Sequence, residues 1–286
     1  MEILQRPVWI KKKINLKDCA DVKARLKGLG LNTVCEEALC PNIGECFSKS
    51  QATFLILGNV CTRQCAFCGV KRGSPQKADP DEPLRVAEGV HRLGLKHVVI
   101  TSVTRDDLPD GGAQAFIDVI REIRKIDPNV TVEILTPDFN LNEEAIAKVV
   151  EAEPDIFAHN LETVPRLYPE ARNGANYQRS LGVLAYIKKC DKSMRTKSGL
   201  MLGLGEREDE VLAVFQDIAG TNCDFLSIGQ YLAPSKAHIS VKEYISPDRF
   251  IGYKKDALEA GFRHVASGTY VRSSYSASEY LESEKV

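Results

Sequence analysis

The sequence has almost no net charge, because 38 Lys and Arg residues are balanced by 39 Asp and Glu residues, for a formal net charge of −1. Binding to nucleic acids or membrane surfaces usually depends on a basic excess, which this chain lacks. No stretch of 18 or more apolar residues occurs, so we expect no transmembrane helix. The amino terminus lacks the order of a secretory signal, because Lys11 to Lys13 follow the first apolar residues. We therefore expect a cytoplasmic protein without nucleic-acid or membrane partners.

Internal repeats and low-complexity segments are also absent from the 286 residues. The chain is 43% hydrophobic and 27% charged, which is typical of a globular protein with a sizeable core. Its length allows either two domains of average size or one large α/β barrel.

Cysteine, in contrast, is abundant, with nine residues. The chain is too long to need disulfide staples and shows no export signal, so a disulfide framework is not expected. Six of the nine cysteines lie between residues 35 and 68, and such clustering favours metal ligation. The other three are isolated and are expected to be small buried apolar residues: Cys19, Cys190 and Cys223.

Short apolar runs alternate with longer amphipathic stretches from about residue 52 onward, which predicts a parallel α/β sheet, or a partial barrel if the sheet curls. The expected strands are residues 53–58, 97–102, 130–135, 155–160, 198–203 and 224–229. The expected helices are residues 81–94, 111–126, 142–153, 177–190 and 208–220. We expect an N-terminal extension over residues 1–51, the barrel over 52–229 and a C-terminal extension over 230–286. Functional residues should then follow the carboxyl ends of the strands.

Cys61, Cys65 and Cys68 follow the first expected strand with the spacing C-x3-C-x2-C. A closed zinc site would need a fourth Cys or His nearby, and none occurs before His91. Iron–sulfur clusters also usually take four thiolates. A cluster held by three leaves one iron open, so three cysteines suggest a site built to receive a ligand.

This motif, with Phe67 before the last cysteine, resembles the radical S-adenosylmethionine (SAM) superfamily. The resemblance implies a partial (β/α)6 barrel and a 4Fe–4S cluster whose fourth iron binds the amino and carboxylate groups of SAM. An electron from the cluster then cleaves SAM into methionine and a 5′-deoxyadenosyl radical, which abstracts hydrogen from the substrate.

A second trio, Cys35, Cys40 and Cys46, has the spacing C-x4-C-x5-C. Together the two trios resemble the lipoyl synthase family, and further matching segments cover nearly the whole chain. They lie at residues 6–13, 40–47, 54–70, 98–113, 132–139, 159–167, 197–206, 226–238 and 271–277. The resemblance implies an auxiliary 4Fe–4S cluster on the second trio and a serine of "RSSY", Ser274 or its neighbour Ser273. Without the resemblance, that segment would read as a loose polar tail.

The resemblance also implies the reaction: the auxiliary cluster gives up sulfur, which replaces hydrogens at C6 and C8 of an octanoyl group on a carrier lysine. The implied carrier is an H protein or an E2 subunit of a 2-oxoacid dehydrogenase. Two SAM molecules would be used per product, and an electron donor such as ferredoxin or flavodoxin would reduce the enzyme.

Further site residues are carried over by the same resemblance. Asn160 and Glu162 would contact the ribose and methionine parts of SAM, although Asn160 could instead cap a helix. The other expected cofactor contacts are Phe67, Thr101, Ser102, Arg179, Lys197, Gly203 and Glu206. Arg272 would bind substrate or cover the auxiliary cluster. His159 and His238 are expected to be ordinary hydrogen-bonded residues.

Three positions depart from the family pattern: Phe47, Asn140 and Thr269 stand where Trp, Gly and Pro are common. Two rival functions stay open. One is another sulfur-inserting radical enzyme such as biotin synthase, against which the second trio and the terminal serines argue. The other is an electron-transfer protein with two clusters, which would fill all four ligands of each cluster and keep its iron. A basic group around residues 188–197 could meet an acidic carrier or simply be a solvated helix face.

Overall fold

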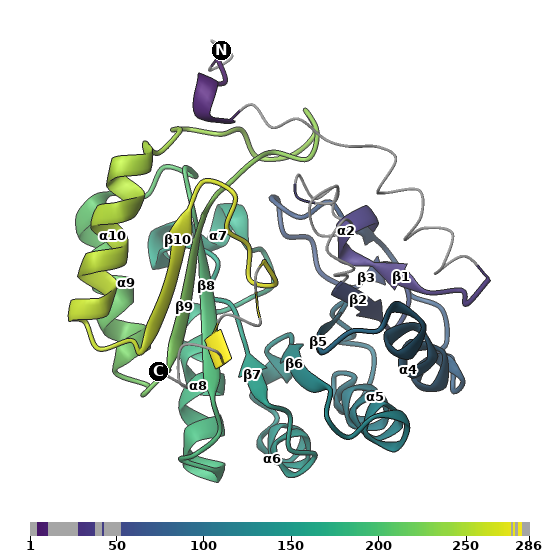
Figure 1. The fold of residues 1–286 in the computed structure, drawn as a ribbon. Helices are drawn as coiled ribbons and strands as arrows, with labels where there is room; N and C mark the ends of the chain where they lie inside the picture. Colours follow the sequence, from purple (N-terminus) through teal and green to yellow (C-terminus); the bar gives the residue numbers. More distant parts are fainter. Residues whose placement is uncertain are drawn as a thin grey trace.

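The computed structural model describes residues 5–10, 28–37, 42, 53–275, 277, 280 and 281, and of Cys35 and Glu36 it describes only the backbone. A curved sheet forms the inner layer and helices cover its outer face (Figure 1). Within the described residues the strand order is β1-β2-β5-β6-β7-β8-β9-β10. Neighbouring strands are parallel except β1 and β2.

The six strands expected from apolar runs of the sequence all occur, with closely similar bounds. The main sheet contains β1 (Asn32–Thr33), β2 (Thr53–Ile56), β5 (His97–Ser102), β6 (Thr131–Leu135), β7 (Ile156–Ala158), β8 (Thr196–Leu202), β9 (Phe225–Gln230) and β10 (His264–Gly268). A small parallel pair, β3 (Val60–Cys61) and β4 (Lys71–Arg72), stands apart from it. The alternating β/α order and parallel pairing confirm the expected fold class.

The helices follow the strands in the order expected of a parallel α/β fold. They are α2 (Val34–Glu37), α4 (Glu82–Leu93), α5 (Ala113–Ile126), α6 (Glu143–Glu151), α7 (Tyr168–Ala171), α8 (Tyr177–Cys190), α9 (Glu208–Ala219) and α10 (Pro247–Glu259). Short 3-10 helices are η1 (Val8–Ile10), η2 (Phe139–Leu141) and η3 (Pro165–Leu167). The side chains of Asn142, Asn176 and Ser246 cap α6, α8 and α10 by accepting from backbone N–H groups of the first turn.

The expectation of six strands was too low for the part of the chain that the structure describes. After β9 the chain forms α10 and then β10, which pairs in parallel with β9. The sheet therefore continues beyond residue 229. The sequence of β10, "HVASG", contains a single large apolar residue, Val265, and so lacks the apolar run that marks the other strands.

The core lies between the sheet and its helices. One apolar cluster joins β2, β5 and β6 to α4, α5 and α6, and a second joins β8 and β9 to α9 and α10. The carboxyl ends of the parallel strands meet at one rim of the curved sheet, which is where this architecture builds its sites.

Candidate active site

A cavity of about 240 Å³ lies inside the curve of the sheet, toward the carboxyl ends of the strands. Distant parts of the sequence meet in its wall: Val34, the loop Phe67–Gly69, Asn160 and Glu162, Gly199–Met201, Tyr231, Leu232, Pro234 and Val271–Ser274. Most of the wall is apolar, and a few polar groups point into it from separate elements. That combination is typical of a ligand site.

In the motif C-x3-C-x2-C, Cys61 is the last residue of β3, whereas Cys65 and Cys68 lie on the loop that connects β3 to β4. Cys68 also lines the cavity. The Sγ atom of Cys61 accepts hydrogen bonds from the backbone N–H groups of Arg63 and Thr104, each at 3.4 Å. Burial raises the pKa of the Cys65 thiol to about 11, and burial likewise raises the pKa of Cys68. Ionised thiolates at these positions therefore need a cationic partner, which iron would supply. The donor set fits the cluster that the sequence implies.

Arg63 fixes this loop to the sheet, and sequence reasoning did not identify it. Its guanidinium donates to both carboxylate oxygens of Asp106 at 2.8 Å and to those of Asp138 at 2.8 and 2.7 Å. It also donates to the side-chain oxygen of Asn140 at 3.0 Å. Asp106 follows β5 and Asp138 follows β6, so one buried cation joins the cysteine loop to two strand ends. Only "RQC" within the motif could have drawn attention to it.

A second buried cation, Arg172, lies behind Cys65 and Glu162 and interacts electrostatically with both. Its Nη1 donates to the hydroxyl of Tyr168 and to Oγ of Ser180, each at 2.9 Å. The Ser180 hydroxyl lies 3.0 Å from Nε2 of His159, whose Nδ1 is 2.9 Å from the carbonyl oxygen of Thr136. Because a carbonyl only accepts, the His159 proton sits on Nδ1.

Asn160 and Glu162 follow β7 and point into the cavity. Asn160 does not cap a helix: its Nδ2 donates to Glu162 at 3.1 Å and to Oγ of Ser273 at 2.7 Å. Glu162 has a positive φ of 70°, a strained conformation for a residue other than glycine. Burial raises its pKa, against the effect of Arg172. Strain and a perturbed carboxyl in one cavity are typical of functional residues.

The segment Val271–Ser274 crosses the inner face of β8 and β9, and two strand glycines make room for it. A Cβ on Gly199 would lie 2.8 Å from Oγ of Ser273, and a Cβ on Gly229 would overlap the carbonyl oxygen of Val271. Glycine inside an apolar strand pattern signals such a close backbone approach, and that signal was available in "SGLMLG" and "LSIGQ".

Lys197 lies fully buried beneath this segment. Its ammonium donates to the carboxylate of Glu133 at 2.9 and 3.2 Å, and to the carbonyl oxygen of Ser273 at 2.6 Å. The ammonium also lies 3.8 Å from the ring centre of Tyr280. Burial disfavours a charged Glu133, but Lys197 outweighs it, and the pKa of Glu133 is lowered. Lys197 therefore faces the C-terminal segment.

The remaining expected contacts are spread around the same rim, and their roles stay predictions. Thr101 donates to the carbonyl of Leu135 at 2.7 Å, whereas the buried hydroxyl of Ser102 has no partner among the described residues. Arg179 donates to Asp138 at 2.8 Å. The carboxylate of Glu206 accepts hydrogen bonds from the backbone N–H groups of Gly203 and Leu204, and it thereby stabilises the turn after β8.

Phe67 and Arg272 both line the cavity, and Nη1 of Arg272 donates to the Val271 carbonyl at 2.7 Å. His238 lies beside the cysteine loop, with Nε2 3.1 Å from the carbonyl oxygen of Cys68 and Nδ1 2.9 Å from Oγ of Ser235.

The second cysteine trio lies outside the described residues: Cys40 and Cys46 entirely, and Cys35 by its side chain. Two described neighbours nevertheless reach the site. Val34 lines the cavity, and Nδ2 of Asn42 donates to the carbonyl oxygen of Tyr270 at 2.6 Å. Tyr270 directly precedes the segment Val271–Ser274, so chain near the trio contacts chain near Ser274.

The basic group around residues 188–197 is divided in the structure: Lys189 and Lys192 are exposed, but two other lysines turn inward. Lys188 is buried and donates to Asp224 at 2.6 Å, and Lys197 is buried against Glu133. Each of these two lysines is buried because it pairs with a buried carboxylate. The sequence spacing does not indicate those partners, because they are distant in the chain.

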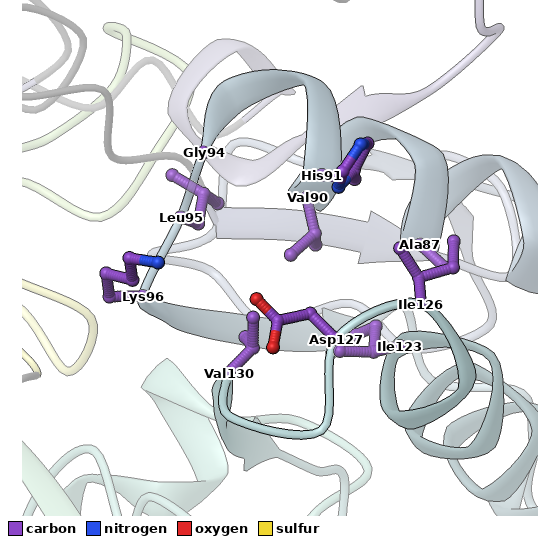
Figure 2. Close-up of a pocket in the computed structure, with 10 residues that line it drawn as sticks. All are labelled: Ala87, Val90, His91, Gly94, Leu95, Lys96, Ile123, Ile126, Asp127 and Val130. Carbon is purple, nitrogen blue, oxygen red and sulfur yellow. The ribbon is translucent and has the colours of Figure 1, made fainter.

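A second cavity, of about 210 Å³, lies between the ends of α4 and α5 (Figure 2). Its polar residues are His91, Lys96 and Asp127, and Lys96 and Val130 directly precede β5 and β6. It therefore lies at the amino ends of the strands, away from the cysteine loop.

Within the described residues, no three His, Cys, Asp or Glu side chains group closely enough to hold one metal ion. None of the helices described is long and apolar enough to cross a membrane.

Comparison with known proteins agrees with the fold and the motifs. Residues 55–218 match the model of the Radical SAM superfamily. The chain is 55% identical to a lipoyl synthase of Caldanaerobacter subterraneus over 96% of both chains. It is 56% identical to a lipoyl synthase of Geobacter metallireducens over 98% of this chain and 99% of that one.

Solved structures resemble it in fold alone. Methylornithine synthase has a TM-score of 0.51 at 14% identity, over 89% of this chain and 79% of that chain. Streptococcus suis SuiB bound to S-adenosylmethionine has a TM-score of 0.53 at 12% identity, over 76% of this chain and 50% of that chain. The superfamily implies a 4Fe–4S cluster and SAM, and the curated relatives imply an auxiliary cluster. By its full-length similarity, the chain belongs to the lipoyl synthase family of radical SAM enzymes.

Proposed function

We propose that this enzyme inserts sulfur at C6 and C8 of an octanoyl group that is amide-linked to a lysine of a carrier protein, which gives the lipoyl group. The observation that carries the proposal is that Cys68 and Ser274 line the same largely apolar cavity. An alkyl chain placed in this cavity would lie between the cluster proposed to generate the radical, at Cys68, and the cluster proposed to donate sulfur, at Ser274.

The target carbons explain why such a cavity is needed. C6 and C8 of an octanoyl chain carry no acidic proton, so a general base cannot activate them. Apolar side chains can hold the chain by excluding water, and the cavity offers Leu200, Met201, Leu232 and Val271. Positioning by shape, without ionic contacts, suits an unfunctionalised hydrocarbon.

Cys61, Cys65 and Cys68 would hold the SAM-binding cluster. When bound, that cluster would supply the electron that cleaves SAM to the 5′-deoxyadenosyl radical. Asn160 and Glu162 would bind the cofactor, because both line the cavity that Cys68 also lines. The other proposed cofactor contacts are Phe67, which lines the cavity, and Thr101, Ser102, Arg179, Gly203 and Glu206, whereas Lys197 is proposed to hold the C-terminal segment.

Cys35, Cys40, Cys46 and a serine of the C-terminal segment would hold the auxiliary cluster, which serves as a sulfur-donating substrate. The contacts of Val34 and Asn42 support this pairing of chain segments. Ser274 suits the ligand role better than Ser273, because the Ser273 hydroxyl is hydrogen-bonded to Asn160. Arg272 would cover the cluster or meet the substrate carbonyl. Two SAM molecules per product and an electron donor of the ferredoxin or flavodoxin type complete the proposal.

An anaerobic assay tests the proposal. The reconstituted enzyme is mixed with dithionite, SAM and an octanoyl-lysine peptide, and the peptide is followed by mass spectrometry. We expect a gain of two sulfur atoms together with 5′-deoxyadenosine, and neither product from Cys68→Ala. Deoxyadenosine without sulfur would point to a different substrate. Full retention of iron after turnover without either product would favour an electron carrier.

A further inference from the structure

The loops around the mouth of the active site carry a net positive charge, whereas the chain as a whole is nearly neutral. Residues 58–78 and residues 225–242 contain no Asp or Glu, although the chain overall has a net charge of −1. Arg63, in the first loop, is buried between Asp106 and Asp138. Besides Lys77, which precedes Asp79 by two residues, four other cations of the two loops are exposed to solvent: Lys71, Arg72, Lys236 and Lys242. We call these four residues the cationic rim.

The two loops are joined around the cysteine motif. The backbone N–H of Ile239 donates to the carbonyl oxygen of Ala66 at 3.1 Å. His238 approaches the carbonyl of Cys68, and Nη2 of Arg72 donates to the carbonyl of Cys65 at 3.0 Å. Since Ala66 lies between Cys65 and Cys68, Arg72 and the second loop flank the same short turn.

Lys242 extends the rim toward the end of β8. Its backbone N–H donates to the carbonyl of Gly203 at 2.8 Å, and its side chain packs against Gly205. The rim therefore runs from the cysteine loop to the β8 loop. Like charges gathered on one edge repel each other and cost stability unless an anionic partner uses them.

The size of the cavity decides which partner the rim meets. About 240 Å³ can hold an alkyl chain but not a folded protein. A carrier protein must therefore stay outside, with its surface around the modified lysine pressed against the loops that line the cavity. Those loops are Phe67–Gly69 and Tyr231–Pro234, which continue directly into the rim.

We propose that the cationic rim docks an acidic surface of the octanoylated carrier protein. The inference rests on the proposed function, since that function supplies the carrier. Electrostatic docking of this kind raises the association rate and is screened by salt. A short neutral octanoyl-lysine peptide enters the same cavity without touching the rim, so rim charge should matter for the carrier alone.

The test compares two triple variants with the same charge change. The rim variant is Lys71→Glu, Lys236→Glu and Lys242→Glu; Arg72 is left intact because it contacts the cysteine loop. The control variant is Lys96→Glu, Lys192→Glu and Lys254→Glu, three exposed lysines elsewhere. Each is assayed with dithionite as reductant, on the octanoylated carrier and on the neutral peptide, at low and high salt.

We expect the rim variant to raise KM for the carrier by about tenfold at low salt, and to lose the salt dependence that the wild type shows. KM for the peptide should change by less than about twofold, and the control variant should behave as wild type. An unchanged KM for the carrier, or an equal loss on the peptide, overturns the proposal. So does a defect that arises only when a protein reductant replaces dithionite, because the rim then docks the electron donor.

A binding measurement separates this inference from the proposed function. The affinity of the cluster-loaded enzyme for the octanoylated carrier is measured without SAM, by calorimetry. Loss of binding in the rim variant but not in the control supports docking, even if the wild type inserts no sulfur. Equal binding by both variants rejects it, even if the wild type is fully active.

Discussion

The ammonium of Lys197 lies 2.6 Å from the carbonyl oxygen of Ser273, so a side chain of strand β8 holds the backbone next to Ser274 by a hydrogen bond. The same ammonium is neutralised by Glu133, at 2.9 Å, inside the sheet. A buried ion pair thus holds the C-terminal segment against the site wall. This relationship connects two residues that are 76 positions apart in the sequence.

Replacing Lys197 should remove the hydrogen bond that holds the C-terminal segment against β8. Lys197→Met leaves Glu133 charged and unpaired, and we expect a loss of about 3–5 kcal/mol in the free energy of unfolding. The double variant Lys197→Met with Glu133→Gln removes the unpaired charge and should recover most of that stability in urea titrations. In this double variant the carbonyl of Ser273 still lacks its hydrogen bond from Lys197. We therefore expect its rate of sulfur insertion to be at least about tenfold lower than its rate of deoxyadenosine formation. Normal sulfur insertion by the double variant would contradict the role of Lys197.

Gly229→Ala should separate the two halves of the reaction. The added methyl overlaps the carbonyl oxygen of Val271 and pushes the serine segment away from β9. We expect sulfur insertion to fall by about tenfold or more, with deoxyadenosine formation within about threefold of wild type. Gly252→Ala on α10 is the matched control, because a Cβ there meets no atom within 4 Å. If both variants behave alike, the close packing at Gly229 is not what positions the segment.

Arg63 should be needed to keep the cysteine loop in place. Arg63→Met removes the pairs with Asp106 and Asp138 and leaves the buried Asp138 with Arg179 as its cationic partner. We expect a loss of unfolding free energy below the roughly 3–5 kcal/mol of a fully unpaired buried charge. We expect the variant to bind less iron and to form little deoxyadenosine. Arg92→Met is the control, because its partner Glu88 is at 3.4 Å on an exposed helix face, worth about 0.5 kcal/mol or less. Equal iron content in the two variants would contradict the anchoring role.

His159 should make stability depend on pH. Burial lowers its pKa from 6.5 to about 4, and Arg172 adds to this effect. Between these two pH values His159 is protonated in the unfolded chain and neutral in the folded chain. The unfolding free energy therefore falls as pH drops from about 6.5 toward 4. The full effect is about 3 kcal/mol, since one pKa unit is worth about 1.4 kcal/mol. Urea unfolding of cluster-free His159→Asn should show a correspondingly flatter pH profile, and an unchanged slope would rule the residue out.

Ser274→Cys tests the proposal that a serine, a weaker iron ligand than a thiolate, holds the auxiliary cluster. A thiolate binds iron more firmly than a hydroxyl does, so the variant should keep its iron but release sulfur more slowly. We expect both insertions to slow, measured as singly and doubly sulfurated peptide over time. Ser273→Ala is the neighbouring control. Completion of both insertions at the wild-type rate in Ser274→Cys would show that the weakness of a serine ligand is unimportant.

The sequence predicts the regular elements well, because apolar period and caps decide them locally. The strand over residues 97–102 and the helix over 177–190 have the expected bounds. It does not predict β10, which pairs with β9 although Val265 is its single buried residue. Nor does it predict Arg63 or Arg172 as site residues, since each acts through partners far away in the chain.

Asn140 shows how a departure from the family pattern is accommodated. Glycine is common at this position, and the backbone there has a positive φ of 52°. Asparagine tolerates this conformation better than most residues do. It also gains two hydrogen bonds that glycine lacks, from Arg63 to its oxygen and from its amide to Asp106, both at 3.0 Å. Sequence alone flagged the departure, and only the fold explains it.

The hydrogen bond from Asn42 to Tyr270 has a consequence for the order in which the enzyme matures. The residues proposed for the auxiliary cluster come from both sides of the barrel sequence, so they cannot meet on a ribosome until nearly the whole chain has emerged. Cys61, Cys65 and Cys68, in contrast, leave it early and within eight residues of each other. We therefore expect the radical-generating cluster to be loaded during or soon after synthesis, and the sulfur-donating cluster only after release. Iron delivery to one protein would then occur in two stages.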